Sequence, residues 1–356
     1  MSIIKDPEYL PVFHHIAKNA GTYVLSWAQM LCRKYHLLRE DNLKCTFDNF
    51  IYEGERVDCN IKTWIKPHIH WTSGKIRRAL IKLKDSRQLT VIYCTLTDLT
   101  GSSKGIFSIS EYQDNLFLEK DTEGHQILEA QMEYINSKYP SAEDPTTNII
   151  PEDDFLNFIE NGDIIPFCVI VDPMEPGWME ARKCIDLIIE KSKRKHALHF
   201  TVLRDPYKRA QSLFHYLTSE ESVHEPTHDS IQAKNFEDYI QSDEVEDSWF
   251  LRSLLDMPDS SIIEPYHLTF AHEGYLKHFR ISDTSKVDNL INQVFHGAYG
   301  IQQSDVEDHV SESNLHRNAT PNKLKIKFED LDPTIQQKFL DRTYWDRKLW
   351  ERYCEC

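Results

Sequence analysis

Two short segments contain residues whose types and spacing suit the binding of an anion. The first, IAKNAGT, places Lys18, Gly21 and Thr22 between a short apolar run and a stretch with helical periodicity. A loop that enters a helix offers main-chain N–H groups and the positive end of the helix dipole, to which lysine and threonine add side-chain donors. The second, VLRDPYKRAQSLF, places Arg204 after an apolar, strand-like run and Ser212 two turns into the next helix. Because an arginine fork and a serine hydroxyl also suit a phosphate, both segments are predicted to bind a phosphate-like group.

The first segment does not fit the phosphate loop of nucleoside triphosphatases. That loop, GxxxxGK[ST], needs a lysine after its second glycine, whereas Lys18 precedes Gly21, and no Ser or Thr follows Lys75 in the other Gly-Lys pair. A lysine ahead of the glycine supplies a mobile ammonium that can follow charge onto a leaving oxygen, which suits group transfer. The alternative for this segment alone is a helix start without a ligand, in which the same residues only cap the helix.

Both segments follow predicted strands in a chain that alternates strands and helices. Apolar alternation and β-branched content predict strands at residues 10–16, 60–66, 89–96, 164–171 and 198–203. Helical spacing predicts helices at residues 22–35, 74–84, 126–139, 152–160, 178–192, 206–217, 236–241, 245–255, 268–279 and 286–295, and a closing pair within 332–353. The pattern predicts an α/β fold, with a P-loop-like, mostly parallel sheet flanked by helices and a helical C-terminal part. Ligands of such sheets bind beyond the carboxyl ends of the strands, where both segments lie.

We expect one domain over residues 1–356 that contains an acidic insertion. From Thr97 the run TDLTGSSKG indicates a loop, and residues 97–163 are acidic and depart from the strand and helix alternation around them. A long insertion near a site is a candidate lid or specificity element.

Composition and charge narrow the class of partner. The chain is 40% hydrophobic and 28% charged, as in ordinary globular proteins, and its formal net charge of -16 disfavours nucleic acid or an anionic membrane surface as the main partner.

The first residues lack the regions of a signal peptide, and no run approaches the length of a bilayer span, so we expect a cytoplasmic protein. A chain that had lost an N-terminal anchor would give the same pattern. The eight cysteines are expected to be buried free thiols, and no metal is predicted.

Together, IAKNAGT and VLRDPYKRAQSLF resemble the two signature segments of the sulfotransferases that use 3′-phosphoadenosine-5′-phosphosulfate (PAPS) as the sulfuryl donor. The first is similar to the loop that binds the 5′-phosphosulfate, and the second to the segment that binds the 3′-phosphate. The RDPxxRxxSxF pattern looks most like the carbohydrate branch, which includes the heparan sulfate 2-O-sulfotransferases. The resemblance covers residues 10–76 and 198–353 and leaves the acidic insertion unmatched. It implies a PAPS-dependent sulfotransferase that needs no metal.

The resemblance implies a set of residues around the donor. Those of the first segment are Lys18, Asn19, Ala20, Gly21, Thr22 and Tyr23, and those of the second are Arg204 and Ser212. The C-terminal run NATPNKLKIKFEDLDP, with the residues that follow it, is similar to the loop and closing helices that these enzymes fold over the nucleotide, which adds Arg317, Asn322 and Lys323. Asn19 and Tyr23 depart from the family, which usually has small hydroxyl residues at both positions.

Sulfuryl transfer to a hydroxyl needs a base for its proton and positive charge for the leaving phosphate. Lys18 suits the second task. For the first, KPHIHW is similar to the paired histidines of the 2-O-sulfotransferases, which makes His70, and secondarily His68, the candidate base. A neutral imidazole suits this work near pH 7, and Glu53 is a reserve. The alternative is that the His-x-His pair is a surface or zinc-binding pair.

The net charge also bears on the acceptor. A chain at -16 suits a polyanion poorly, so the expected acceptor is a neutral or cationic small alcohol, a phenol, a simple glycan or a protein side chain rather than a heparin-like chain. Two other functions stay open. One is a nucleotide-binding, kinase-like enzyme, for which the sequence offers no Walker lysine, and the other is a catalytically inactive, sulfotransferase-like binding protein.

Overall fold

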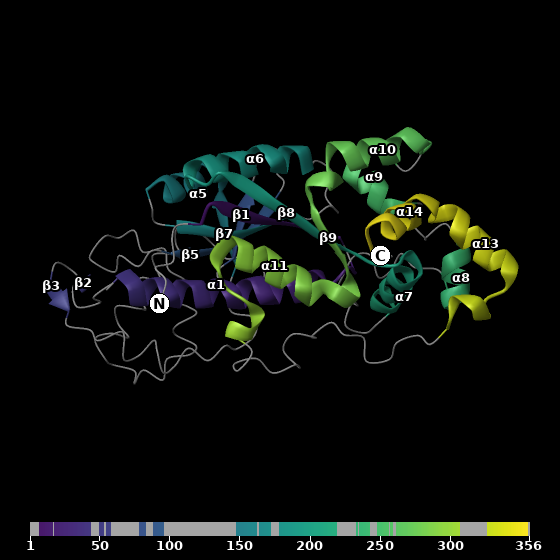
Figure 1. Ribbon diagram of the computed structural model, residues 1–356, viewed down its shortest axis with the longest axis horizontal. Coiled ribbons are helices and arrows are strands. Elements are labelled where there is room, and N and C mark those ends of the chain that lie inside the picture. The colour runs from purple at the N-terminus through teal and green to yellow at the C-terminus, as the bar shows by residue number, and fades with distance from the viewer. Residues whose placement is uncertain are drawn as a thin grey trace.

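A computed structural model gives the arrangement of the strands and helices (Figure 1). The residues that it describes are 7–16, 18–43, 50–52, 55–57, 78–82, 88–95, 147–161, 164–171, 178–218, 233, 235–242, 248–255, 257–258, 261–306 and 326–354. The predicted strand at 60–66, the predicted helix at 126–139 and the first part of the predicted insertion, 97–146, lie outside these residues.

Within the described residues, seven strands form one sheet in the order β6-β4-β5-β7-β1-β8-β9. Their bounds are β1 (Tyr9–His14), β4 (Arg78–Lys82), β5 (Gln88–Thr95), β6 (Thr147–Pro151), β7 (Ile164–Val171), β8 (His196–Leu203) and β9 (Arg280–Asp283). Neighbouring strands are parallel except where β5 pairs with β4 and β7, so β5 runs against the others. A separate antiparallel pair joins β2 (Phe50–Tyr52) to β3 (Glu55–Val57). The predicted α/β class and mostly parallel sheet are confirmed.

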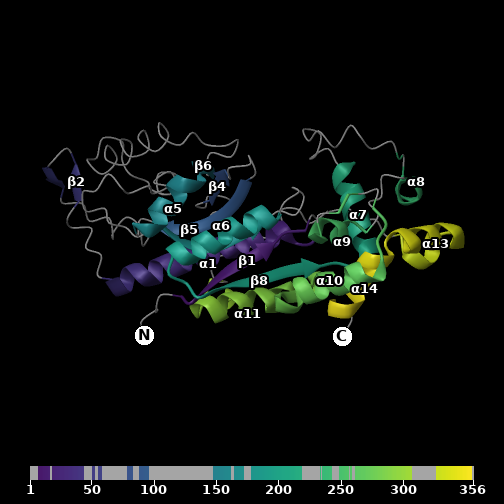
Figure 2. The ribbon, with the colours of Figure 1, turned by 90° about the horizontal axis from the view of Figure 1, so that it is seen from above.

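Helices cover both faces of the sheet (Figures 1 and 2). Their bounds are α1 (Gly21–Leu43), α5 (Glu152–Glu160), α6 (Trp178–Lys191), α7 (Pro206–Leu217), α8 (Phe236–Gln241), α9 (Trp249–Leu255), α10 (Pro265–Gly274), α11 (Val287–Tyr299), α13 (Pro333–Arg342) and α14 (Tyr344–Cys354), with 3-10 turns η4 (Leu276–His278), η5 (Thr284–Lys286), η6 (Gln303–Asp305) and η8 (Phe328–Asp330). On one face, α1 and α11 pack against Phe13, Phe167 and Phe200 of three neighbouring strands. On the other, α5 and α6 pack against Leu10 and Val12 of β1. Strand β1 is therefore buried on both sides, as its apolar run requires.

Further helices pack beyond the carboxyl ends of the strands (Figure 2). One cluster joins α7 to α8 and α13 through Tyr207, Phe236 and Phe339. A second cluster joins α9, α10 and α14 to Ile16 and Leu203, the residues at which β1 and β8 leave the sheet. The predicted helical C-terminal part is thus confirmed, and it surrounds the edge of the sheet at which the two predicted anion-binding segments lie.

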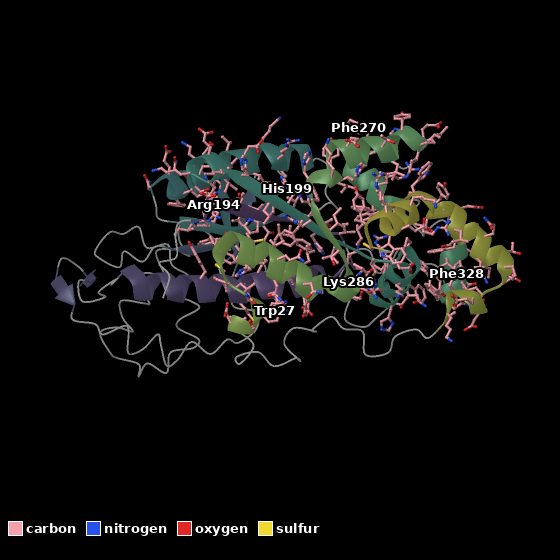
Figure 3. The ribbon with its side chains drawn as sticks, viewed as in Figure 1. Trp27, Arg194, His199, Phe270, Lys286 and Phe328 are labelled. Carbon is pink, nitrogen blue, oxygen red and sulfur yellow. The ribbon has the colours of Figure 1, made fainter. Side chains whose placement is uncertain are left out.

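A buried arginine ties the opposite edge of the sheet together. Arg194, labelled in Figure 3, donates from Nη1 to the main-chain oxygen of Tyr9 in β1 at 2.6 Å and to the hydroxyl of Tyr299 in α11 at 2.8 Å. Its Nη2 donates to the main-chain oxygen of Pro166 in β7. Because a buried guanidinium needs several acceptors, these bonds fix the amino ends of two central strands against α11.

Most predicted elements among the described residues are confirmed to within a few residues, but the first helix, predicted at 22–35, runs on to Leu43, strands β2 and β3 were not predicted, and further local predictions differ from the structure. Residues 78–82, predicted to be helical, form strand β4, because pairing with β5 and β6 outweighs a weak helical periodicity. The helix predicted at 268–279 begins at Pro265 and ends at Gly274, and the short strand β9 that follows was missed. Residues 147–161 of the predicted insertion belong to the main body, since β6 pairs with β4 and α5 packs on α6.

Candidate functional site

The two predicted anion-binding segments lie side by side at the carboxyl edge of the sheet. Strands β1 and β8 are parallel neighbours whose register runs from Tyr9 opposite His196 to His14 opposite Thr201. From β1 the chain goes to the strands on one side of the sheet, and after β7 it crosses to β8 and β9 on the other. Such a reversal of strand order is the place where α/β sheets bind ligands. The loops that follow β1 and β8 therefore occupy the expected position for a site.

Two hydrogen bonds join these loops to each other. Arg204, which follows β8, donates from Nη1 to the main-chain oxygen of Lys18 at 3.1 Å. In the opposite direction, Asn19 donates from Nδ2 to the main-chain oxygen of Val202 in β8, also at 3.1 Å. Arg204 thus holds the backbone of the first loop, and Asn19 ties that loop to the end of β8.

The amide of Asn19 also presents a buried acceptor. Asn19 is only 3% exposed, and its bond to the carbonyl of Val202 fixes which end of the amide is the donor. The other end, Oδ1, is buried and has no hydrogen-bond partner among the described residues. A buried acceptor in a folded protein usually receives a hydrogen bond from water or a ligand. This oxygen therefore suits a donor group, such as a hydroxyl, at the edge of the anion site.

The backbone of the first loop bends sharply before α1. Lys18 has φ 67° and Ala20 has φ 62°, left-handed values that non-glycine residues seldom adopt. Gly21, the first residue of α1, is needed for a different reason: a Cβ at this position would overlap the imidazole of His15. The loop is therefore held by a close approach between His15 and the start of the helix.

Helix α7 brings the ring of Tyr216 to the loop. The ammonium of Lys18 lies 2.9 Å from the ring centre of Tyr216, which lies one turn after Ser212 on the same face of the helix. The hydroxyl of Ser212 makes no hydrogen bond to any residue in the described part of the chain. Asp205 caps α7 by accepting from the N–H of Lys208 at 2.9 Å, which fixes the helix directly after Arg204.

Burial and neighbouring carboxylates shift the pKa of Arg204 in opposite directions. Burial lowers the pKa of its guanidinium, while the carboxylates of Asp283 and Asp205 oppose that shift. A guanidinium nevertheless keeps its charge in proteins. The carboxylate of Asp283 already accepts two hydrogen bonds, from the indole N–H of Trp350 at 3.0 Å and from the main-chain N–H of Ser285 at 2.8 Å. A positive charge thus stands partly buried at the end of β8.

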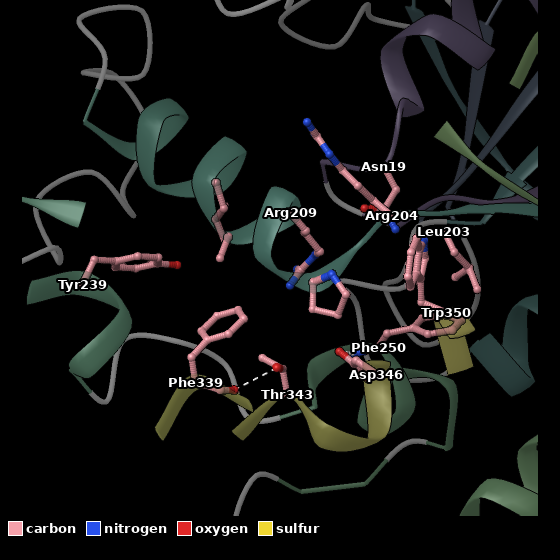
Figure 4. A pocket seen from close by; sticks show the side chains of 13 residues that line it. Asn19, Leu203, Arg204, Arg209, Tyr239, Phe250, Phe339, Thr343, Asp346 and Trp350 are labelled. Carbon is pink, nitrogen blue, oxygen red and sulfur yellow. Dashed lines mark hydrogen bonds between the residues drawn. The ribbon is translucent and has the colours of Figure 1, made fainter. Parts of the chain in front are cut away.

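A pocket adjoins the two loops between α7 and the C-terminal helices (Figure 4). Asn19 and Arg204 line it from the loops, and Arg209 and Asp346 line it from α7 and α14. The guanidinium of Arg209 lies 4.4 Å over the ring of Trp249, so an aromatic face holds this charge as well. Arg209 is the second arginine of the RDPYKR run. Arg209 was not among the predicted site residues, although its place in that run was a signal for it.

The structure places the other predicted residues of the loop as follows. Thr22 is exposed in the first turn of α1, and its main-chain oxygen accepts from Ser26 at 2.9 Å. The hydroxyl of Tyr23 donates to Asp288 of α11 at 2.6 Å, so it faces α11. The predicted residues Glu53, His68, His70, Arg317, Asn322 and Lys323 lie outside the described residues.

A pair of histidines lies in the sheet behind the loop. His14 Nε2 and His199 Nδ1 are 3.0 Å apart, and the ring of Phe279 packs on both imidazoles. Burial, with the charge of His199 second, lowers the pKa of His14 well below its usual value, and burial lowers the pKa of His199 to about 4. Both rings are therefore neutral at pH 7, one donating to the other. His14 therefore packs within the sheet, against His199 and Phe279.

Comparisons with known protein families, with curated proteins and with solved structures find no match to this chain. Among the described residues, no helix combines the length and the apolarity that crossing a bilayer requires. The fold and the geometry of the loops are therefore the findings on which a function must rest.

Proposed function

We propose that this protein is a sulfotransferase that moves a sulfuryl group from PAPS to an acceptor hydroxyl by in-line displacement. The observation that carries the proposal is the pairing of Lys18 and Arg204, which lie 186 residues apart in the sequence and are joined by a hydrogen bond at the carboxyl edge of the sheet. The two segments that resemble the signatures of the PAPS-dependent enzymes thus meet, and each carries a cationic residue where they meet. The reversal of strand order at this place also supports the proposed P-loop-like fold of the sheet.

The side chains present fit a ligand with two separate anionic groups. The first turn of α1, the ammonium of Lys18 and the close approach at Gly21 suit the 5′-phosphosulfate. Arg204 and Ser212 suit the 3′-phosphate, because a guanidinium binds two phosphate oxygens at once and a serine hydroxyl adds a donor. Arg317, Asn322 and Lys323 are proposed to complete the nucleotide site. When bound, PAPS supplies a sulfuryl group on a good leaving phosphate.

The catalytic roles follow from the charges that the reaction moves. As the bond from sulfur to the leaving phosphate oxygen breaks, Lys18 stabilises the negative charge that collects on that oxygen. As the acceptor oxygen bonds to sulfur, its proton must leave, and His70, or His68 beside it, is proposed to take it. No redox change occurs, and the products are a sulfate ester and 3′-phosphoadenosine 5′-phosphate (PAP).

The acceptor is proposed to carry little negative charge. A protein at -16 repels polyanions over most of its surface, and the positive charges at the loops suit the donor. A small alcohol, a phenol, a simple glycan or a protein side chain therefore fits better than a heparin-like chain. Efficient sulfation of heparan precursors would contradict this part of the proposal.

A binding protein without turnover is the second candidate, and one contact favours it. The hydroxyl of Tyr23, at a position where the resembled family has a small hydroxyl residue, is held by Asp288 of α11. One donor expected around the phosphosulfate is thereby committed elsewhere. A protein of this kind would bind PAP and PAPS and release no sulfate ester.

Turnover with and without Lys18 separates these candidates. Purified protein is incubated with PAPS and a mixture of phenols, small alcohols and neutral glycans, and the formation of PAP is followed by chromatography. We expect PAP to form only when acceptor is present, and Lys18→Ala to abolish it, whereas Lys208→Ala, which removes an exposed lysine from α7, retains it. Binding of PAPS without PAP formation in any mixture would instead support the binding protein.

A further inference from the structure

The side chain of Lys18 is held by contacts at both ends. Its main chain is fixed, because the residue has a left-handed conformation and its carbonyl oxygen accepts from Arg204 at 3.1 Å. At the other end, the ammonium lies 2.9 Å from the ring centre of Tyr216 in α7. The lysine therefore bridges the loop after β1 and the helix after β8, and its charge stands beside the face of α7 that carries Ser212.

An aromatic ring beside the ammonium of Lys18 affects its charge differently from a carboxylate. A carboxylate in this position would neutralise the ammonium and compete with an incoming phosphate. An aromatic face attracts a cation through its quadrupole and leaves the net charge in place. The ring of Tyr216 therefore holds the ammonium of Lys18 in place without removing its charge.

We infer that Tyr216 is a positioning residue for Lys18, whose ring holds the ammonium between the first turn of α1 and Ser212 before and after the donor binds. The inference rests on the proposed function, because it concerns how the site orients the cation that binds the phosphosulfate. A lysine side chain loses several rotatable bonds of freedom when it is fixed, and prior placement by the ring reduces that loss on binding. The ring, and not the hydroxyl, does this work.

Two substitutions at Tyr216 separate the effect of its aromatic face from that of side-chain size. Tyr216→Phe keeps the aromatic face and Tyr216→Leu keeps an apolar side chain without it. In titration calorimetry with PAP, we expect Tyr216→Phe to bind within about twofold of the wild type and Tyr216→Leu to bind about three- to tenfold more weakly. In a Lys18→Met background, Tyr216→Leu should cause no further loss, since the interacting charge is gone. Equal affinity of the Phe and Leu variants, or an equal loss in both backgrounds, would overturn the inference.

A ligand-free measurement checks the contact in the wild-type protein. Protons next to the ammonium of Lys18 that lie over an aromatic ring should resonate upfield in NMR spectra, in the wild type and in Tyr216→Phe, and return to ordinary positions in Tyr216→Leu. Ordinary positions in the wild type would overturn the inference without any variant. Failure of the wild type to bind PAP would overturn the proposed function and this role with it, whereas PAP binding that ignores residue 216 would overturn this role alone.

Discussion

Arg204 donates a hydrogen bond to the main-chain oxygen of Lys18, so a side chain from the loop after β8 holds the backbone of the loop after β1. Asn19 reverses the relationship by donating to the main chain of β8 at Val202. A guanidinium has five N–H donors, and the bond to Lys18 uses one of them. The same arginine can therefore shape the first loop and present its charge to an anion, which couples loop geometry to ligand binding.

We expect Asn19→Ala to destabilise the folded protein by about 1–3 kcal/mol, because it removes a buried hydrogen bond to Val202 and leaves a buried carbonyl without that donor. Urea unfolding followed by circular dichroism measures this change. Asn157→Ala, at an exposed position of α5, is the control and should change the free energy of unfolding by less than about 0.5 kcal/mol. Equal effects of the two substitutions would show that the bond does not stabilise the fold.

We expect Gly21→Ala to displace the imidazole of His15, since the new Cβ would overlap that ring. Overpacking of this kind costs about 1–3 kcal/mol, and the moved ring should also weaken PAP binding. His15→Ala combined with Gly21→Ala should recover most of the stability, because the overlapping group is then absent. A double variant as unstable as Gly21→Ala alone would mean that the glycine serves another purpose.

The pair His14 and His199 predicts a loss of stability in acid. In the folded protein, burial keeps the pKa of both imidazoles below the usual 6.5, whereas in the unfolded chain they bind protons near that value. Below pH 6.5 the unfolded state therefore binds more protons, and the free energy of unfolding should fall by up to about 1.4 kcal/mol per pH unit for each histidine, toward the pKa of about 4 of His199.

Unfolding by urea between pH 7.5 and 4.5 tests this dependence. His199→Gln should make the decline shallower, because one titrating group is gone, while His196→Gln, at the exposed start of the same strand, should leave the slope unchanged. A decline that is the same in all three proteins would place its origin at other groups.

The position of both loops could be predicted from the sequence, because the carboxyl ends of parallel strands share one edge and the segments around Lys18 and Arg204 each follow an apolar strand. Strand β4 could not, because residues 78–82 carry a helical spacing and become a strand only by pairing with β5 and with β6, which lies about seventy residues further on. Strand β9 has four residues, too few for a periodic pattern.

The partner of Lys18 had no signal in the sequence. Tyr216 lies almost two hundred residues away from it, and only the parallel pairing of β1 with β8 brings α7 to the first loop. Its spacing of four from Ser212 places both on one face of the helix, but that spacing alone does not indicate a contact with Lys18. Contacts of this kind depend on the tertiary fold.

The central claim is that Lys18 and Arg204 form one site for PAPS, and titration calorimetry with PAP tests it most directly. The wild type, Arg204→Ala and the control Lys191→Ala, which removes a partly exposed lysine of α6 that pairs with Glu160, are titrated with PAP and with ATP and magnesium. The account predicts binding of PAP in the micromolar range, weakened about ten- to hundredfold by Arg204→Ala and unchanged by Lys191→Ala. No binding of PAP by the wild type, or a preference for ATP with magnesium, would contradict it.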